Sequence, residues 1–291
     1  MNHLKLSTEV DPGIGRVRIG RDSRILVLGS CFADEVGRKM QEGGLDVTVN
    51  PFGTLYNPVS VANTLARIAS GIPFGPEDCI GVGAGSGLIG STSCHTLLAR
   101  PSAEEFLQVA GCRLEEAAAF YKDCDIVIVT LGTAWVYIRE GSVVANCLKR
   151  PAQEYERKFL DVQAVQAVLS SMVRSAGGRK FIFTVSPIRH LKDTAHGNQL
   201  SKSTLLLAVE HVVSSCPELT EYFPAYETVL DELRDYRFYA RDLVHPSELA
   251  VDIVWERFMQ FAFEPETIAA VEEAQKRFHS SQHRPLLHTE P

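Results

Sequence analysis

The fold is decided by the stretch Arg24-Ile25-Leu26-Val27-Leu28-Gly29-Ser30-Cys31-Phe32-Ala33. Its apolar run ends at a glycine, which is typical of a strand that is buried on both faces of a parallel sheet. Apolar side chains then recur every four residues from Phe32 to Met40, and this period predicts a helix over 33–42. Ser30 and Cys31 are therefore expected in a tight turn between a buried strand and the start of a helix.

The rest of the chain continues this alternation of strands and helices. Apolar and β-branched runs predict strands at 46–50, 125–131 and 180–185, and a short strand or loop near 222–230. Helical patterns fall between and after them, at 58–69, 103–109, 114–124, 159–175, 201–215 and 247–261. Such alternation predicts an α/β fold with a mostly parallel sheet that is covered by helices on both faces.

Three segments stand outside the alternation. Residues 72–101 are rich in Gly and Ser, and they are expected to form an irregular or hairpin-forming insertion after the second strand. A small hairpin is expected from 135–138 and 142–145. Residues 264–291 are expected to be a polar, partly helical extension. Because no linker or internal repeat interrupts the chain, we expect one domain over 1–291.

Composition excludes several classes of protein. Apolar residues make up 45% of the 291 residues, which is enough for a large core and argues against disorder. The net charge is −7 and no Lys/Arg-rich run occurs, so nucleic acid is not expected as a partner. No stretch of about 18 apolar residues occurs, so membrane insertion is not expected. Nothing in the sequence predicts the oligomeric state.

The cysteines bear on the compartment and on metal binding. They number seven, an odd count with no Cys-x-x-Cys pair, which favours reduced thiols. No apolar run of signal-peptide length follows Met1, so a cytoplasmic location is expected. Neighbouring residues such as Cys94 and His95 rarely chelate one tetrahedral ion, so no metal is expected, and no cofactor is expected either.

Polar and glycine residues follow the ends of several predicted strands, where sites form in parallel α/β sheets. These strand ends are Gly29-Ser30-Cys31, Asn50-Pro51-Phe52-Gly53, Gly132-Thr133 and Ser186-Pro187. At the first of them, the N–H groups of a helix N-terminus can stabilise a thiolate or an oxyanion. The alternative is purely structural, with Cys31 as a small buried side chain and Ser30 as a helix cap.

A second motif, Asp242-Leu243-Val244-His245, lies late in the chain. An Asp three residues before a His in a loop can turn back to the imidazole Nδ1 and leave Nε2 facing a nucleophile. Nucleophilic catalysis needs such a base together with a group that orients it. The alternative is a solvated loop histidine that precedes a helix.

Together these motifs resemble the SGNH/GDSL hydrolase superfamily. The resemblance implies a three-layer α/β/α, flavodoxin-like fold and an acyl hydrolase that forms a covalent acyl intermediate. It also implies a nucleophile after the first strand, oxyanion donors from a Gly after the second strand and an Asn after the third, and a late Asp-x-x-His. The matching positions here are Gly29-Ser30-Cys31, Gly53, Gly132, Asp242 and His245.

The narrower resemblance is to the GSCFA-domain family. It rests on 28–33 and 50–54, and on the stretches 131–137, 186–190 and 235–239. In the superfamily register, Cys31 rather than Ser30 occupies the place of the nucleophile, and a thiolate forms more easily than an alkoxide near neutral pH. The usual oxyanion Asn is replaced by Ala134, so a substitute is expected from Thr133, Asn50 or Asn146.

Other polar groups near the strand ends are expected to line the pocket. Expected oxyanion donors are Cys31, Gly53 and Thr133, and the expected substrate-binding residues are Asn50, Tyr56, Asn57, Gly132, His190 and Asn146. Around another helix start, polar side chains either bind an anionic part of the substrate or simply cap the helix: Arg189, Asn198, Ser201 and Lys202. Both tryptophans, Trp135 and Trp255, are expected in the core.

The leading functional expectation is an esterase-like or thioesterase-like hydrolase. His245 would activate Cys31, with Ser30 as the alternative nucleophile, and Asp242 would orient His245. The substrate would be a small-molecule or carbohydrate ester. A second hypothesis is an acyltransferase acting on a carbohydrate or polyol, and a third is a non-catalytic ligand-binding protein that keeps the fold.

Overall fold

The centre of the protein is a parallel sheet of five strands. The structure, a computed structural model, describes residues 8–282. The strands lie in the order β10-β9-β5-β1-β2. In chain order this is 2-1-3-4-5, the order of flavodoxin-like doubly wound sheets. Their bounds are β1 Arg24–Gly29, β2 Asp46–Val49, β5 Ile126–Leu131, β9 Lys180–Val185 and β10 Thr220–Tyr222.

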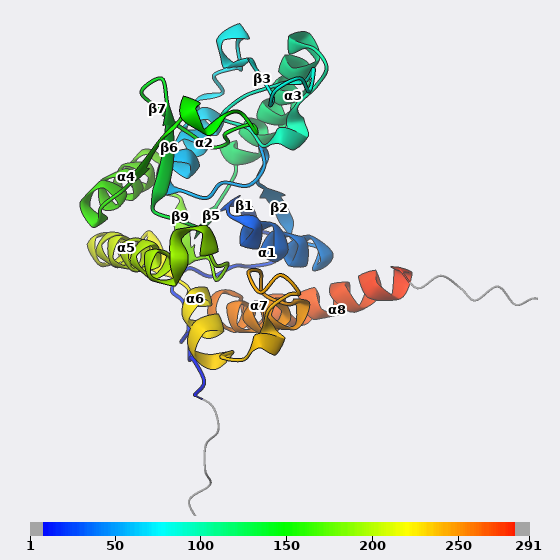
Figure 1. Cartoon of the computed structure of the whole chain (residues 1–291). Helices are drawn as coiled ribbons and strands as arrows, with labels where there is room; N and C mark the ends of the chain where they lie inside the picture. Colours follow the sequence, from blue (N-terminus) through cyan, green and yellow to red (C-terminus); the bar gives the residue numbers. More distant parts are fainter. Residues whose placement is uncertain (1–7, 283–291) are drawn as a thin grey trace, which may run out of the picture.

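Helices cover both faces of the sheet, as the alternation predicted. One face carries α2 (Pro58–Ser70), α3 (Ala103–Lys122), α4 (Val162–Ser175) and α5 (Thr194–Ser215), and the other α1 (Cys31–Glu42), α7 (Glu248–Ala262) and α8 (Pro265–Gln282). Figure 1 shows α7 and α8 on the opposite side of the sheet from α2. The strands serve both cores because successive side chains point to opposite faces. In β1, Leu26 and Leu28 join the α2 side, whereas Ile25 and Val27 join the α1 side.

Two small antiparallel sheets are added to this framework. Within the 72–101 insertion, β3 (Ile80–Gly81) pairs with β4 (Ile89–Gly90). The expected hairpin forms from β6 (Trp135–Arg139) and β7 (Ser142–Val144), and β8 (Glu156–Phe159) adds a third strand that the sequence did not predict. The remaining short elements are α6 (Ala225–Glu227), a π-helical turn (Thr228–Glu232) and 3₁₀ turns at Pro76–Asp78, Thr96–Leu98, Ala152–Glu154, Leu191–Asp193 and Tyr236–Phe238.

Several predicted boundaries were wrong. The two helices expected at 103–109 and 114–124 are one helix, α3, and α5 begins at Thr194 rather than at Ser201. The strand or loop expected near 222–230 is β10 followed by helical turns. Within the 264–291 extension, α8 runs from Pro265 to Gln282, and residues 283–291 lie outside the described part of the chain.

The end of β1 depends on a glycine. Gly29 has φ +142°, and a Cβ at this position would lie 2.1 Å from the carbonyl oxygen of Thr130 in β5. The absence of a side chain lets the chain turn close to β5, where the Ser30 N–H donates to that same oxygen at 3.1 Å. The turn therefore places Ser30 and Cys31 at the carboxyl end of β1, with Ser30 bonded to the neighbouring centre strand β5.

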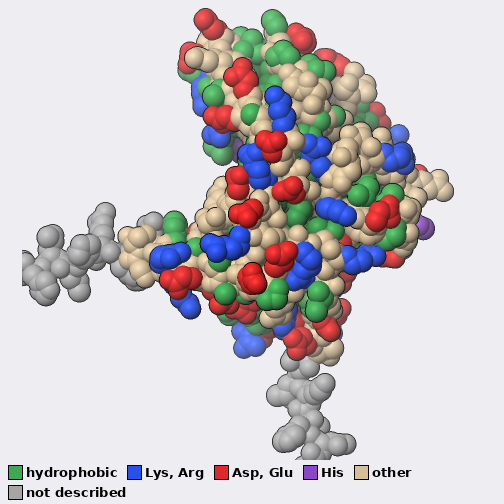
Figure 2. Space-filling view, turned by 180° about the vertical axis from the view of Figure 1, so that it is seen from behind, with side chains coloured by type: hydrophobic (Ala, Val, Ile, Leu, Met, Phe, Trp, Pro, Cys, Tyr) green, Lys and Arg blue, Asp and Glu red, His purple; other side chains and the backbone are tan. Residues whose placement is uncertain are grey.

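The surface carries charges of both signs. Figure 2 shows acidic and basic side chains interspersed over the face seen from behind. Among residues 8–282, no helix has both the length and the apolar character needed to cross a bilayer.

Candidate active site

The turn after β1 separates the two neighbouring nucleophile candidates. Ser30 is 1% exposed, caps α1 by accepting the Phe32 N–H at 3.3 Å, and has its hydroxyl 3.2 Å from that of Thr130. Cys31 is the first residue of α1, and its half-buried side chain faces a cavity. Its N–H has no carbonyl partner within the helix, because the first turn of a helix leaves its N–H groups free. The geometry therefore makes Ser30 a cap and leaves Cys31 as the accessible group.

The cavity beside Cys31 has a volume of about 420 Å³. It lies between the strand ends of the large sheet, the three-stranded sheet of β6, β7 and β8, and the loop before α7. Its walls include most of the residues that the sequence singled out: Cys31, Tyr56, Asn57, Thr133, Asn146, His190 and His245.

The Asp242–His245 loop forms the arrangement that its spacing predicted. His245 Nδ1 lies 2.6 Å from Asp242 Oδ2, while Asp242 Oδ1 accepts the N–H groups of Val244 and His245 at 2.9 and 3.0 Å. Leu243 has φ +59°, and this left-handed residue turns the loop back on itself. The backbone N–H groups of His245 and Val244, with the His245 side chain, lower the pKa of Asp242 to about 2. The carboxylate is therefore ionised at any ordinary pH, and Nε2 is the free nitrogen of His245.

Cys31 and His245 face the same cavity without a direct hydrogen bond between them in the described structure. The recorded partner of Cys31 Sγ is the hydroxyl of Tyr56, at 3.3 Å. The His245 side chain is 45% exposed, so it has freedom to move. Catalytic hydrogen bonds are often long in ligand-free structures and tighten when a substrate binds.

Tyr56 connects the thiol to the loop after β2. The Thr54 hydroxyl donates to the Tyr56 oxygen at 3.4 Å, and the Tyr56 hydroxyl lies 3.3 Å from Cys31 Sγ, where either group can be the donor. Burial, followed by the hydrogen bond with Cys31, raises the pKa of Tyr56 to about 12. The hydroxyl therefore keeps its proton beside the sulfur and can donate a hydrogen bond to negative charge that forms there.

His190 lies in the same cavity as a neutral imidazole. Its backbone N–H donates to Asn198 Oδ1 at 2.9 Å, and its ring meets the ring of Tyr56 edge-on with 6.3 Å between centroids. Burial, assisted by the positive charge of Lys202, lowers the pKa of His190 to about 4. Its Nε2 atom is buried and has no hydrogen-bond partner within the described residues, so it is available to a ligand.

Two expectations drawn from the second strand end need correction. The N–H of Gly53 donates to the Asn50 carbonyl at 2.7 Å, and Gly53 does not line the Cys31 cavity, so the structure does not place an oxyanion donor there. Asn50 is structural as well, because its side chain accepts the Gly29 N–H at 2.8 Å and donates to Asp34 at 2.7 Å. The hydrogen bonds of both residues join segments next to the turn that presents Cys31.

The third strand end is similarly engaged. Gly132 and Thr133 both donate their N–H groups to the Tyr56 carbonyl, at 2.9 and 2.8 Å, and Gly132 does not line the cavity. Thr133 does line it, but its hydroxyl lies 3.1 Å from that of Ser201 and accepts the Trp135 N–H. Gly132 therefore contacts the backbone of Tyr56, and its role in substrate binding stays a prediction.

Asn57 and Asn146 reach the cavity wall as expected, although both also hold the backbone. Asn57 caps α2 by accepting the Ser60 N–H at 2.9 Å, and Asn146 Oδ1 accepts the Leu148 N–H at 2.7 Å. The amide nitrogen of Asn146 has no protein partner among the described residues, so it is the freer donor of the two.

The comparisons with known proteins agree with the motif at the first turn. The family model described as the GSCFA family matches residues 24–258, which spans every strand of the large sheet and the Asp242–His245 loop. The chain belongs to the GSCFA family. A search of the curated proteins found no match.

The sequence did not predict that aromatic and basic side chains line one wall of the Cys31 cavity in this GSCFA protein. Both tryptophans were expected in the core. Trp255 is buried there, with 3% of its surface exposed, but Trp135 lines the cavity. Trp135 and Tyr137 of β6 line the cavity, and the Arg157 guanidinium stacks 4.0 Å from the Trp135 ring centre. The alternation of aromatic residues at 135 and 137 was the available signal, since such residues share one face of a strand.

Beneath the Cys31 cavity, a layer of buried polar side chains supports the strand ends. Lys202 is fully buried, and its amine donates to the carbonyls of Gly132 and Ser186, both at 2.7 Å. Asn198 and Ser201 bond to the backbone N–H groups of His190 and Ala134. These side chains therefore hold the ends of β5 and β9 together and do not face an anion. No group of three or more His, Cys, Asp or Glu side chains suited to a metal ion occurs within residues 8–282.

Proposed function

We propose that this GSCFA protein is a cysteine-based acyl hydrolase of the SGNH/GDSL type. The observation that carries the proposal is the convergence on one cavity of Cys31 at a helix N-terminus and a histidine that is oriented by a carboxylate. A nucleophile, a base and a group that orients the base are the components that covalent acyl transfer requires. The 2-1-3-4-5 strand order and the sequence order of these components support the SGNH-like placement.

The reaction proceeds in two balanced steps. In the first, Cys31 Sγ attacks the acyl carbonyl carbon, its proton passes to His245 Nε2, and the bond from that carbon to the leaving oxygen or sulfur breaks. The leaving group takes the proton from His245 and departs as an alcohol or thiol. In the second, water attacks the thioester, releases the carboxylic acid and restores the thiol.

The charges that develop on Cys31 and His245 during the reaction are stabilised by groups that the structure already orients. The positive end of the α1 dipole lies at Cys31, where it stabilises negative charge that develops during the attack. Asp242 stabilises the imidazolium that forms on His245. Because no direct hydrogen bond joins His245 to Cys31, proton transfer uses one intervening water or a movement of the half-exposed imidazole.

Tyr56 is the proposed substitute for the missing oxyanion Asn. The negative oxygen of the tetrahedral intermediate forms next to Sγ, where the protonated Tyr56 hydroxyl already lies at 3.3 Å. The Cys31 N–H at the helix start supplies the second donor. This assignment replaces the roles expected for Gly53 and Asn50.

Trapping of the acyl-enzyme tests the proposed function. We expect p-nitrophenyl acetate to transfer one acetyl group to the protein, and peptide mass spectrometry to place it on Cys31. In the His245→Ala variant, both the formation of the acetyl-enzyme and its hydrolysis should be much slower, because both steps need the base. Acetylation spread over several surface cysteines and lysines, unaffected by His245→Ala, would contradict the proposal and favour a non-catalytic binding protein.

Replacing Tyr56 by phenylalanine is expected to lower kcat by about 10²-fold, the usual cost of losing one oxyanion donor, with a smaller change in KM. Steady-state kinetics on the same ester measure the effect. The matched control is Tyr137→Phe, since Tyr137 lines the same cavity but bonds to Lys192 rather than to Cys31. Equal losses in the two variants would show that Tyr56 acts through cavity shape alone.

A further inference from the structure

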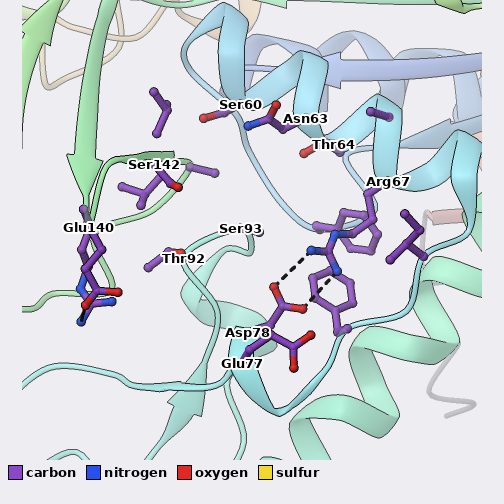
Figure 3. A pocket seen from close by; sticks show the side chains of 18 of the residues that line it. Ser60, Asn63, Thr64, Arg67, Glu77, Asp78, Thr92, Ser93, Glu140 and Ser142 are labelled. Carbon is purple, nitrogen blue, oxygen red and sulfur yellow. Dashed lines mark hydrogen bonds and ion pairs between the residues drawn. The ribbon is translucent and has the colours of Figure 1, made fainter.

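A second and larger cavity, of about 690 Å³, lies beside the proposed active site. It is enclosed by α2, the 72–101 insertion and the β6–β7 hairpin. The hydrolase chemistry described above uses none of its residues. Figure 3 shows the Arg67–Asp78 pair on one side of this cavity and Glu140 and Ser142 on the other.

The lining of this second cavity is rich in uncommitted hydroxyl and amide groups. Five of its polar side chains make no side-chain hydrogen bond to any described residue: Asn63, Thr64, Thr92, Ser93 and Ser142. They project from three different segments of the chain toward the same space (Figure 3). Because polar groups in a concave site usually find partners, these donors and acceptors are suited to a ligand with several hydroxyl groups.

The charges around the second cavity argue against an anionic ligand. The Arg67 guanidinium is held by both oxygens of Asp78, at 3.1 and 3.2 Å, and stacks 4.2 Å from the Phe74 ring centre. The other cation, Arg139, pairs with Glu140 at 2.8 Å. Glu77, by contrast, has no ion-pair partner in the described structure. With both cations neutralised and one carboxylate free, a neutral polyhydroxylated molecule matches the site better than a phosphate or sulfate.

The second cavity shares part of its wall with the Cys31 cavity. Val144 and Ala145, at the end of β7, line both. The Ala145 and Asn146 N–H groups both donate to the Thr92 carbonyl at 2.9 Å, which ties β7 to the 72–101 insertion at this boundary. A ligand that crosses this wall would therefore place one part among the hydroxyl groups and another beside Cys31.

We propose that the second cavity binds the saccharide part of an acylated carbohydrate whose ester is presented to Cys31. Presentation of the ester to Cys31 rests on the proposed acyl-transfer function. Binding of the saccharide in the second cavity does not depend on that function. It names the substrate class as a carbohydrate ester, with a neutral glycan as the part recognised by hydrogen bonding.

The proposal is tested by saccharide binding to the full chain, measured by saturation-transfer NMR and titration. The probes are maltotriose, cellotriose and chitotriose, with trigalacturonate as the anionic comparison. We expect at least one neutral trisaccharide to bind and trigalacturonate not to bind. The Asn63→Ala and Ser93→Ala variants should each weaken that binding about tenfold, since each removes hydrogen bonds to the ligand.

Cys31→Ala is the control that separates this proposal from the proposed function. It should leave trisaccharide binding unchanged while abolishing acyl-enzyme formation. If no trisaccharide binds, or if binding is unaffected by both Asn63→Ala and Ser93→Ala, the saccharide site is overturned even where Cys31 is acetylated normally. If a trisaccharide binds as expected but Cys31 is never acetylated, the hydrolase assignment fails and the saccharide site stands.

Discussion

Replacing Cys31 by alanine is expected to lower kcat/KM for ester hydrolysis on the order of 10⁴-fold or more, because the covalent route is then lost and only binding and oxyanion contacts remain. The neighbouring Ser30→Ala change is expected to leave kcat/KM within a fewfold of the wild-type value. Ser30 is 1% exposed and caps α1, so its removal should instead cost about 1 kcal/mol of unfolding free energy. We therefore expect one of these adjacent substitutions to affect mainly activity and the other mainly stability.

Ester hydrolysis and urea unfolding, measured on the same two preparations, check this pair. Cys31→Ala should unfold close to the wild-type midpoint, since its side chain is only half-buried and its sulfur bonds to Tyr56 alone. The reverse pattern, with activity lost in Ser30→Ala and retained in Cys31→Ala, would move the nucleophile to Ser30. That result would require the Ser30 hydroxyl to leave Thr130 and turn toward the cavity.

The sheet was predictable because its strands are buried on both faces. A fully buried run of apolar and β-branched residues such as 126–131 has few alternatives to a central strand, and the structure places it there. Helix limits were harder to predict. The two helices expected at 103–109 and 114–124 form one helix that contains Gly111, where an added Cβ would meet no atom within 4 Å apart from the helix's own backbone. The nearby Ala110 and Leu114 are buried in the core. Packing of that face offsets the cost of about 1 kcal/mol that a helical glycine carries.

The sequence predicted most of the residues around the cavity, but it predicted a contact between two of them only where one local motif contained both. Asp242 and His245 are three residues apart, and the loop between them determines their contact. The roles of Gly53 and Asn50 depend instead on backbone hydrogen bonds between distant segments. The sequence does not reveal that Asn50 adopts φ +38° and bridges Gly29 to Asp34. Tyr56 was expected in the pocket, but its bond to Cys31 follows from two strand ends meeting in space.

Lys202→Met is expected to destabilise the protein by about 2–4 kcal/mol, the largest stability effect that we predict. The substitution keeps most of the side-chain volume but removes the amine that donates to the buried carbonyls of Gly132 and Ser186. An unsatisfied buried polar group costs about 1–3 kcal/mol. Urea unfolding measures the loss. The matched control is the exposed Lys192→Met, which should change the unfolding free energy by no more than about 0.5 kcal/mol.

The effect of Lys202→Met is also expected to depend on pH, with a sign that follows from burial. Burial lowers the pKa of Lys202 to about 7, well below the ordinary value of 10.5. A neutral amine has two N–H groups, which match the two carbonyls that it contacts, whereas an ammonium has a third proton with no such partner. Between these two pKa values the unfolded chain binds a proton that the folded chain does not, so Lys202 adds stability as the pH rises.

The gap in unfolding free energy between wild type and Lys202→Met should therefore widen by about 1 kcal/mol per pH unit from pH 7 to pH 10. Other titrating groups are common to both proteins and cancel in this difference, so a gap that stays constant or narrows over that range would show that Lys202 is buried as an ammonium.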